Sequence, residues 1–168
     1  MAEYLLPAEL VDLARKVVAA NIAAGRTVAL AESCTGGLVS AAITEIPGSS
    51  DMFEAGFVTY SDDAKIAGLN VNEDVIGTFG AVSVATAWAM AQGALEASDA
   101  DIAVAITGIA GPDGGTPQKP VGTVVFARAT RMDGPDEVVA DSKLFDASGG
   151  RSGVRLQAAL CALELLMP

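Results

Sequence analysis

Histidine is absent from the 168 residues of this chain. Serine–histidine and cysteine–histidine nucleophiles are therefore excluded, and so is a zinc site built on imidazole ligands. Only two cysteines occur, far apart in the sequence, which favours neither a thiolate metal site nor a disulfide scaffold. We expect no metal ion and no cofactor, and any general base must be a carboxylate, a lysine, a tyrosine or a bound water.

Positive charge and aromatic side chains are also scarce. Lys and Arg number 10 against 21 Asp and Glu, which gives a net charge of −11. This balance argues against a nucleic-acid binder and against docking on an anionic membrane surface. A small anionic ligand is compatible with this negative net charge only if several of the few Lys and Arg side chains lie together at one site. Aromatic residues make up 5% of the chain and hydrophobic residues 51%, so we expect a core of Ala, Val, Leu and Ile.

Long apolar runs and a charged-then-apolar leader are missing as well. No segment has membrane-spanning length, so we expect a cytoplasmic protein. The length is typical of one domain covering residues 1–168, and no repeat, linker or low-complexity tract interrupts it. The Ala-rich composition is compatible with self-association into a homo-oligomer.

The order of the predicted elements indicates an α/β fold. Apolar runs predict five strands, at 27–31, 53–60, 101–107, 121–129 and 137–144. Segments with helical spacing lie between most of them, and the turn at 133–135 predicts an antiparallel hairpin. We therefore expect a three-layer α/β/α fold with a mostly parallel mixed sheet of about five strands.

One predicted helix begins after Ser83 and carries the only tryptophan. The spacing of Val84, Trp88, Ala91 and Leu95 is typical of a buried stripe. This pattern predicts that Trp88 belongs to the core rather than to a ligand site.

The strongest functional pattern is a strand–turn–helix corner. The strand at 27–31 is followed by Ser33, Cys34 and Thr35, then by Gly36 and Gly37, and a helix-forming segment begins at position 38. A helix N-terminus presents unpaired N–H groups that stabilise an oxyanion or a phosphate. We expect the N–H groups of residues 35–37 to bind the developing oxyanion beside a hydroxyl nucleophile.

The nucleophile in this corner needs a base. Lys65 is the best candidate for activating Ser33, and Ser61 could cap a short helix that places Lys65 and Tyr60 at one pocket. A lysine acts as a base at neutral pH only when it is desolvated or close to another cation. Tyr60 could relay the proton. Cys34 is a second candidate nucleophile, but no adjacent base or cation indicates a thiolate.

A loop rich in Gly and Pro follows the strand at 101–107. Loops at strand ends often carry ligands in open α/β sheets, which makes Thr107, Gly108 and Gly111 candidates for lining a site. The loop has neither the Gly-Lys-Ser/Thr ending of a P-loop nor a Gly-x-Gly-x-x-Gly corner. Plain turn chemistry and ligand binding both remain open for it.

Two arginines lie in the first turns of the last predicted helix. Arg151 and Arg155 are four residues apart and therefore on one face. A cation at a helix start opposes the helix dipole, so this pair indicates an anionic partner, either a ligand or acidic residues elsewhere in the fold.

Taken in order, the motifs of this chain resemble a known family. They are Ala-Glu-Ser-Cys-Thr-Gly-Gly at 31–37, Ile-Pro-Gly-Ser-Ser at 46–50, Tyr-Ser at 60–61 with Lys65, Gly-Ala-Val-Ser at 80–83, and the Gly- and Pro-rich stretch 107–122. They are similar to those of the C-terminal domain of the competence/damage-inducible CinA family, which includes stand-alone nicotinamide-nucleotide amidases. The resemblance covers nearly the whole chain.

This resemblance implies a three-layer α/β/α fold and a specific reaction. The carboxamide of nicotinamide mononucleotide would be hydrolysed to nicotinate mononucleotide and ammonia. Ser33 would be the nucleophile, with Tyr60 and Lys65 as its activating pair. Thr107 and the glycine loop would line the site, and Arg151 would hold substrate oxygens.

The family commonly has Gly-Asp-Arg before the last helix, whereas this chain has Gly-Gly-Arg at 149–151. An acidic neighbour of Arg151 is therefore missing at this position. Two alternatives to the amidase remain open. One is a catalytically silent nucleotide-sensing or protein-interaction domain, and the other is an amidase or esterase for other small substrates.

Overall fold

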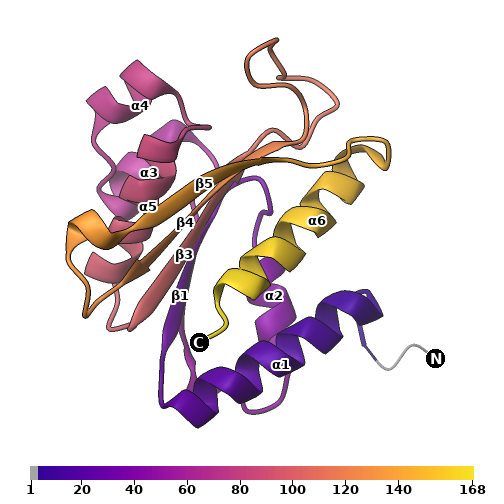
Figure 1. The fold of residues 1–168 in the computed structure, drawn as a ribbon, viewed down its shortest axis with the longest axis vertical. Coiled ribbons are helices and arrows are strands. Elements are labelled where there is room, and N and C mark those ends of the chain that lie inside the picture. Colours follow the sequence, from indigo (N-terminus) through magenta and orange to yellow (C-terminus); the bar gives the residue numbers. More distant parts are fainter. Residues whose placement is uncertain (1–3) are drawn as a thin grey trace.

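In the computed structural model, which describes residues 4–168, one sheet lies between two layers of helices (Figure 1). The strands are β1 (Val28–Glu32), β2 (Phe53–Val58), β3 (Ile102–Gly108), β4 (Thr123–Thr130) and β5 (Val139–Leu144). The helices are α1 (Ala8–Ala24), α2 (Leu38–Thr44), α3 (Asp62–Leu69), α4 (Glu73–Phe79), α5 (Val84–Glu96) and α6 (Gly150–Leu165), with short 3-10 helices at Ser49–Asp51 and Pro135–Glu137. None of the described helices is long and apolar enough to cross a membrane.

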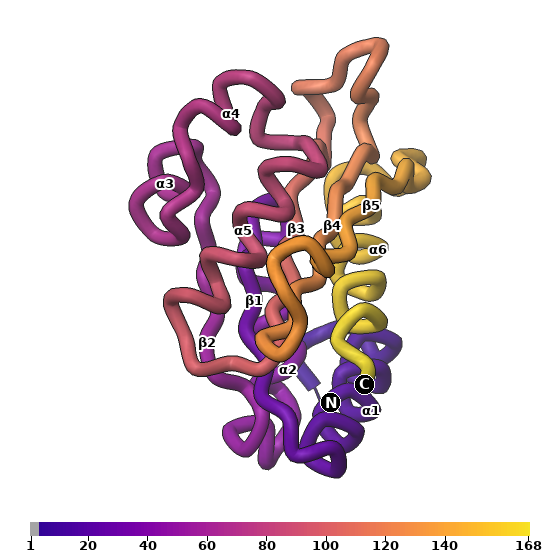
Figure 2. Tube along the Cα trace, turned by 60° about the vertical axis from the view of Figure 1, so that its left-hand side comes forward, coloured from indigo at the N-terminus to yellow at the C-terminus, as the bar shows by residue number. Residues whose placement is uncertain are grey.

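The strand order is β2-β1-β3-β4-β5, as Figure 2 shows from one edge to the other. β1 pairs in parallel with β2 and β3, whereas β4 is antiparallel to both β3 and β5. Four strands therefore run in one direction and β4 runs against them. The carboxyl ends of β1, β2 and β3 meet at one end of the sheet, which is where open α/β sheets bind ligands.

The predicted three-layer fold with a mixed sheet is confirmed. The expected hairpin of β4 and β5 is present, but β3 and β4 form a second antiparallel pair that the sequence did not predict. The loop between them folds back on itself, because Ile109 N–H donates to Thr123 O and Gly122 N–H donates to Ile109 O, each at 2.8 Å. The chain therefore returns directly beside β3 instead of crossing over.

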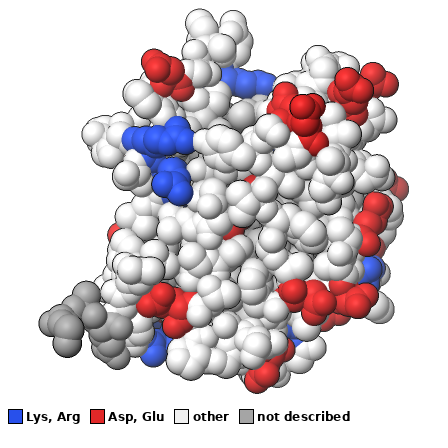
Figure 3. All heavy atoms as spheres, turned by 180° about the vertical axis from the view of Figure 1, so that it is seen from behind, with Lys and Arg blue, Asp and Glu red and all other residues white. Residues whose placement is uncertain are grey.

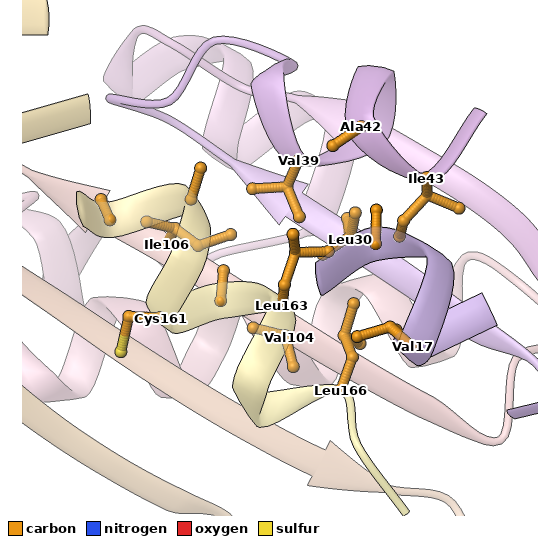
Figure 4. Packing of buried hydrophobic residues seen from close by; sticks show 14 of the residues in the cluster. Val17, Leu30, Val39, Ala42, Ile43, Val104, Ile106, Cys161, Leu163 and Leu166 are labelled. Atoms are coloured by element: carbon orange, nitrogen blue, oxygen red, sulfur yellow. The ribbon is translucent and has the colours of Figure 1, made fainter. Parts of the chain in front are cut away.

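The two faces of the sheet carry side chains of different size. Leu30, Val104 and Ile106 point toward α1, α2 and α6, where they pack with aliphatic residues of those helices (Figure 4). The alternate positions of β1 and β3 are alanines that face α5. Because successive side chains of a strand point to opposite faces, this alternation builds one bulky core and one thin core.

The thin core explains why the expected burial of Trp88 is wrong. α5 buries Ala87, Met90, Ala91 and Ala94 against the alanine face, and the small side chains let it approach the sheet closely. The Trp88 side chain lies at the flank of this contact and is 37% exposed. Helical spacing predicts which residues form the apolar stripe of α5. It does not predict how close the helix lies to the sheet, and therefore whether an indole ring fits between them.

The contact between α3 and α5 predicts a strong effect of one glycine. A Cβ atom on Gly93 would lie 2.0 Å from the backbone oxygen of Leu69, so α3 could not keep its place against α5. We expect Gly93→Ala to lower the free energy of unfolding by about 2–3 kcal/mol in urea titrations, as overpacking does. The control is Gly77→Ala in α4, where a Cβ meets nothing within 4 Å; it should change stability by about 1 kcal/mol at most, toward higher stability. Equal effects of the two variants would contradict the packing argument.

Candidate active site

The predicted corner lies at the carboxyl end of β1. Ser33 N–H donates to Ile106 O at 2.9 Å, which continues the β1–β3 pairing by one residue, and Gly36 N–H donates to Ser33 O at 2.9 Å. Gly36 and Gly37 have φ values of 60° and 95°, a left-handed conformation that other residues adopt only at a cost. The turn is therefore fixed to the sheet on one side and to the start of α2 on the other.

Lys65 and Ser33 are in direct contact. Ser61 caps α3 through its side chain, and Lys65 lies in the first turns of that helix. Its Nζ is 2.9 Å from Ser33 Oγ, 2.8 Å from Thr59 O and 3.2 Å from Tyr60 O. The Lys65 side chain is 1% exposed. An ammonium group has three N–H donors, and these three acceptors match them; as a neutral amine, the same nitrogen can accept the Ser33 proton.

The surroundings of Lys65 favour the neutral amine. Burial lowers the pKa of Lys65 below its ordinary value because removal from water penalises the charged form. The charge of Asp62 and the thiol of Cys34 act in the opposite direction and raise this pKa, but they do not outweigh the burial. A desolvated amine at hydrogen-bond distance from a hydroxyl is the geometry of a nucleophile and its general base.

The surroundings of Cys34 make it a poor nucleophile. Its side chain is 5% exposed, and burial raises the pKa of the thiol to about 11. The sulfur is therefore a protonated thiol at neutral pH, whereas a cysteine nucleophile must be a thiolate. This environment favours Ser33 over Cys34 as the reactive group.

Tyr60 is close to this pair but does not lie between its members. Its backbone oxygen accepts a hydrogen bond from Lys65, while its side-chain hydroxyl accepts one from Arg151 Nη2 at 2.6 Å. The Tyr60 side chain is 58% exposed. Because Lys65 Nζ contacts Ser33 Oγ directly, proton transfer between them requires no intermediate hydroxyl group.

A cavity of about 240 Å³ opens beside the corner. Its lining residues are Cys34, Tyr60, Gly108, Ile109, Ala110, Gly111, Asp113, Gly114 and Arg151. Arg151 joins two walls of the cavity, because its Nη1 donates to Gly111 O at 2.6 Å while its Nη2 contacts the tyrosine. A larger cavity, of about 450 Å³, lies around Trp88 on α5, and neither Ser33 nor Lys65 lines either of the two cavities.

Thr107 and the two glycines of the corner have structural contacts. The Thr107 hydroxyl is buried and donates to Ala81 O at 2.9 Å, which ties the end of β3 to the segment before α5. The N–H groups of Gly36 and Gly37 both have partners inside the corner. These donors are therefore not directed at a ligand, in contrast to what the sequence pattern predicted.

The partner of Gly37 is Glu32, a residue that the sequence did not single out and that holds the corner in place. This carboxylate is fully buried. Its two oxygens accept hydrogen bonds of 2.6 to 3.2 Å from the N–H groups of Gly37, Val39 and Ser40 and from the hydroxyl groups of Thr35 and Ser40. A negative charge at a helix N-terminus is favourable. One signal in the sequence could have predicted this role: Glu32 is an acidic residue at the end of a buried strand, shortly before the start of a helix.

Arg155 was predicted to face an anion, but its partners are neutral. Its Nε donates to Cys34 O at 3.2 Å and its Nη2 donates to Thr35 O at 2.9 Å. Arg151 likewise contacts a hydroxyl and a carbonyl oxygen. Across residues 4–168, neither arginine forms an ion pair with a carboxylate, and of the two only Arg151 lines the cavity. Several basic side chains lie near the upper end of the face in Figure 3, with acidic side chains at the same end and along the rest of that face.

The residues described here offer no group of three or more Cys, Asp or Glu side chains that could hold a metal ion.

Comparisons with known proteins agree on one family. The family model described as CinA C-terminal domain matches residues 10–168. The putative competence-damage inducible protein of Symbiobacterium thermophilum is 52% identical over 84% of this chain, which spans 34% of that protein. The nicotinamide-nucleotide amidohydrolase PncC of Escherichia coli is 51% identical over 94% of this chain and 93% of its own length. The crystal structure of the competence/damage inducible protein CihA from Agrobacterium tumefaciens has a TM-score of 0.90 at 46% identity and covers 96% of each chain.

The buried carboxylate makes the corner sensitive to one isosteric change. Glu32→Gln would place an NH₂ group against N–H and O–H donors, leaving several buried donors without an acceptor. We expect the free energy of unfolding to fall by about 2–4 kcal/mol, measured by chemical denaturation. The matched control is Glu54→Gln on the exposed side of β2, which should change stability by about 0.5 kcal/mol or less. A stable Glu32→Gln protein would show that the carboxylate does not hold the start of α2.

Proposed function

The chain belongs to the CinA C-terminal domain family, and we propose that it hydrolyses the carboxamide of nicotinamide mononucleotide to nicotinate mononucleotide and ammonia. The name of the Escherichia coli relative, which is similar over nearly its whole length, supports this activity. The contact that supports it most directly is the 2.9 Å distance between Lys65 Nζ and Ser33 Oγ, with the lysine buried.

The first step is attack of Ser33 on the amide carbon. Neutral Lys65 accepts the hydroxyl proton as the Oγ–carbon bond forms, and the carbonyl oxygen of the amide becomes an oxyanion. The backbone oxygens of Thr59 and Tyr60 stabilise the resulting ammonium because they accept its other hydrogens. Burial lowers the pKa of Lys65, which favours the free amine that accepts this proton.

The second step breaks the carbon–nitrogen bond. The Lys65 ammonium donates its proton to the departing nitrogen, which leaves as ammonia, and an ester of Ser33 remains. A water molecule then attacks this ester, with Lys65 accepting the water proton and returning it to Ser33 Oγ. Nicotinate mononucleotide and the original hydroxyl group are thereby produced, and all atoms balance.

Arg151 and Tyr60 fit a binding role in this scheme. Arg151 has five N–H donors, of which two contact Gly111 and Tyr60, so the remainder can meet phosphate oxygens of the substrate. The exposed ring of Tyr60 lines the same cavity and suits the planar pyridine ring. Gly108 and Gly111 allow the loop after β3 to form the opposite wall.

Removal of the nucleophile or the base separates catalysis from binding. Ser33→Ala should abolish ammonia release from nicotinamide mononucleotide, with a loss of at least ~10³-fold in kcat, while the fold is retained. Lys65→Met should lower kcat by about 10²–10⁴-fold with little change in substrate affinity. A coupled ammonia assay and a binding titration measure both quantities.

The controls are Ser142→Ala on β5 and Lys16→Met on α1, both exposed and remote from the corner. Full activity of the Ser33→Ala protein would remove this hydroxyl from the mechanism, and a pure affinity loss in Lys65→Met would reassign that lysine to binding. Tight binding without turnover by the unaltered protein would favour the alternative, a non-catalytic nucleotide-sensing domain.

The pH dependence follows from the amine. Because the free base is the active form, kcat/KM should rise with pH through the pKa of Lys65, at a midpoint below the pKa of about 10.4 of an exposed lysine. The negative charge of Asp62 favours the ammonium form and raises this pKa, so Asp62→Asn should move the midpoint to lower pH. Asp63→Asn is the control, since it removes the same charge from the neighbouring position, while Asp62 is the carboxylate that raises the pKa of Lys65. A shift to higher pH would contradict the assignment of this limb to Lys65.

A further inference from the structure

Two arginines lie together at the opposite end of the sheet from Ser33. Arg26 comes between α1 and β1, and Arg128 lies in β4 beside Val104 of β3. A cavity of about 400 Å³ separates their surroundings from solvent, and its lining residues are Ala24, Gly25, Arg26, Asp101, Ile102, Arg128, Thr130, Met132 and Asp133. In a chain with 10 Lys and Arg against 21 Asp and Glu, two arginines at one cavity are a concentration of positive charge. The proposed function does not use it.

Arg26 is held in place by the ends of two helices. Its Nε donates to Asn21 Oδ1 at 2.7 Å, and its Nη2 donates to Leu166 O at 2.6 Å. These hydrogen bonds join the end of α1 to the residue that follows α6, close to the amino end of β1 (Figure 1). They use two of the five N–H donors of the guanidinium group. Arg26 therefore has a fixed position and still has donors for a ligand.

Arg128 has no acceptor within the described part of the chain. Val124 and Phe126 of β4 belong to the core on the side of α1, α2 and α6, and by alternation Arg128 and Thr130 point to the same side. The Nε atom of Arg128 is buried without a hydrogen-bond partner, and its guanidinium group donates no hydrogen bond within residues 4–168. An unpaired buried donor costs free energy, and the cost is larger for a charged group. This position favours an acceptor from outside residues 4–168.

The two guanidinium groups are close enough to repel each other. Burial lowers the pKa of Arg26, and the neighbouring positive charge of Arg128 lowers it further, whereas the charge of Asp101 raises it. The Asp101 carboxylate forms no ion pair with either arginine among residues 4–168, and its Oδ2 accepts hydrogen bonds from the N–H and the hydroxyl of Thr27. An anion between the two guanidinium groups would replace this repulsion by attraction.

We propose that Arg26, Arg128 and Thr130 form a binding site for a phosphate group, either free or as the monoester of a small molecule. Guanidinium groups match phosphate oxygens in pairs, and a phosphate dianion has enough oxygens to accept from both arginines and from the Thr130 hydroxyl. A carboxylate has one charge and two oxygens, which match one guanidinium group rather than two. The cavity is larger than a phosphate group, so the organic part of a monoester also fits in it.

This site is separate from the proposed active site. It lies at the amino ends of β1 and β3, whereas Ser33 follows the carboxyl end of β1. None of the residues that line the 240 Å³ cavity beside the corner lines this one. Neither proposal therefore depends on the other, and each is tested by its own measurement.

The test is an NMR titration of the isotopically labelled full chain with inorganic phosphate, and separately with ribose 5-phosphate, at constant ionic strength. We expect saturable shifts of the amide signals of residues 25–27 and 128–133, apart from any shifts at residues 33–37. Arg128→Met, which keeps an unbranched side chain, should weaken binding at the first group by about tenfold or more, as loss of hydrogen bonds between charged partners does. Lys16→Met, exposed on α1, removes the same charge elsewhere and should stay within about twofold.

Thermal unfolding gives a second readout. Because a ligand that binds only the folded state stabilises it, phosphate should raise the Tm of the unaltered protein and of Lys16→Met by more than that of Arg128→Met. Without phosphate, Arg128→Met should unfold at the same temperature as the unaltered protein or higher, since it removes a repulsive charge and breaks no hydrogen bond. A lower Tm of Arg128→Met in both buffers, with an unchanged effect of phosphate, would instead assign this arginine to the fold alone.

Shifts confined to residues 33–37, or equal affinities of Arg128→Met and the unaltered protein, would overturn the proposal. If Arg128→Met does not fold, Thr130→Val takes its place, with an expected loss of about threefold or more in affinity and the same criterion. Binding of inorganic phosphate alone would support the site and identify free phosphate as its ligand. Tighter binding of ribose 5-phosphate would support it and identify a small phosphorylated molecule.

Discussion

The structure depends on the enclosure of one amine beside one hydroxyl group. Lys65 loses its contact with water, and three oxygen atoms replace that water: the side chain of Ser33 and the backbone of Thr59 and Tyr60. Burial lowers the pKa of Lys65. Hydrogen bonds to the two backbone oxygens offset part of the free-energy cost of removing the amine from water. The cap of α3, the end of β2 and the corner after β1 are all needed to hold these atoms together.

Two residues of opposite charge, Glu32 and Arg155, form hydrogen bonds with different parts of the corner. The Glu32 carboxylate takes the N–H groups at the start of α2, and the Arg155 guanidinium takes the carbonyl oxygens of the turn before it. A short turn with two left-handed glycines would otherwise have few contacts that fix its peptide planes. Between these charges, Ser33 keeps a rigid position without an acidic or imidazole partner of its own.

The unequal faces of the sheet leave different amounts of space beside the strands. The alanine face draws α5 so close that little room remains above the strands, and Trp88 is displaced to its flank. The loop after β3 instead turns back at the carboxyl end of the sheet and forms one wall of the small cavity. The site therefore lies at the strand ends, where Arg151 of α6 contacts Tyr60, two residues after the end of β2.

Sequence alone determined the chemistry available to this protein and its local geometry. A chain without histidine leaves a lysine, a tyrosine, a carboxylate or a bound water as the base for a serine, and two glycines after a buried strand favour a turn at that point. Only the tertiary structure determined which side chains of the site contact one another. Lys65 and Ser33 are 32 residues apart, and Arg155 and Thr35 are 120 apart. Such contacts depend on strand order and on which face each helix covers, and no local pattern carries that information. For the same reason, the sequence suggested Tyr60 as a proton relay, whereas in the fold Lys65 contacts the Ser33 hydroxyl directly. The sequence likewise suggested an anionic partner for Arg155, whereas in the fold its guanidinium binds carbonyl oxygens of the turn.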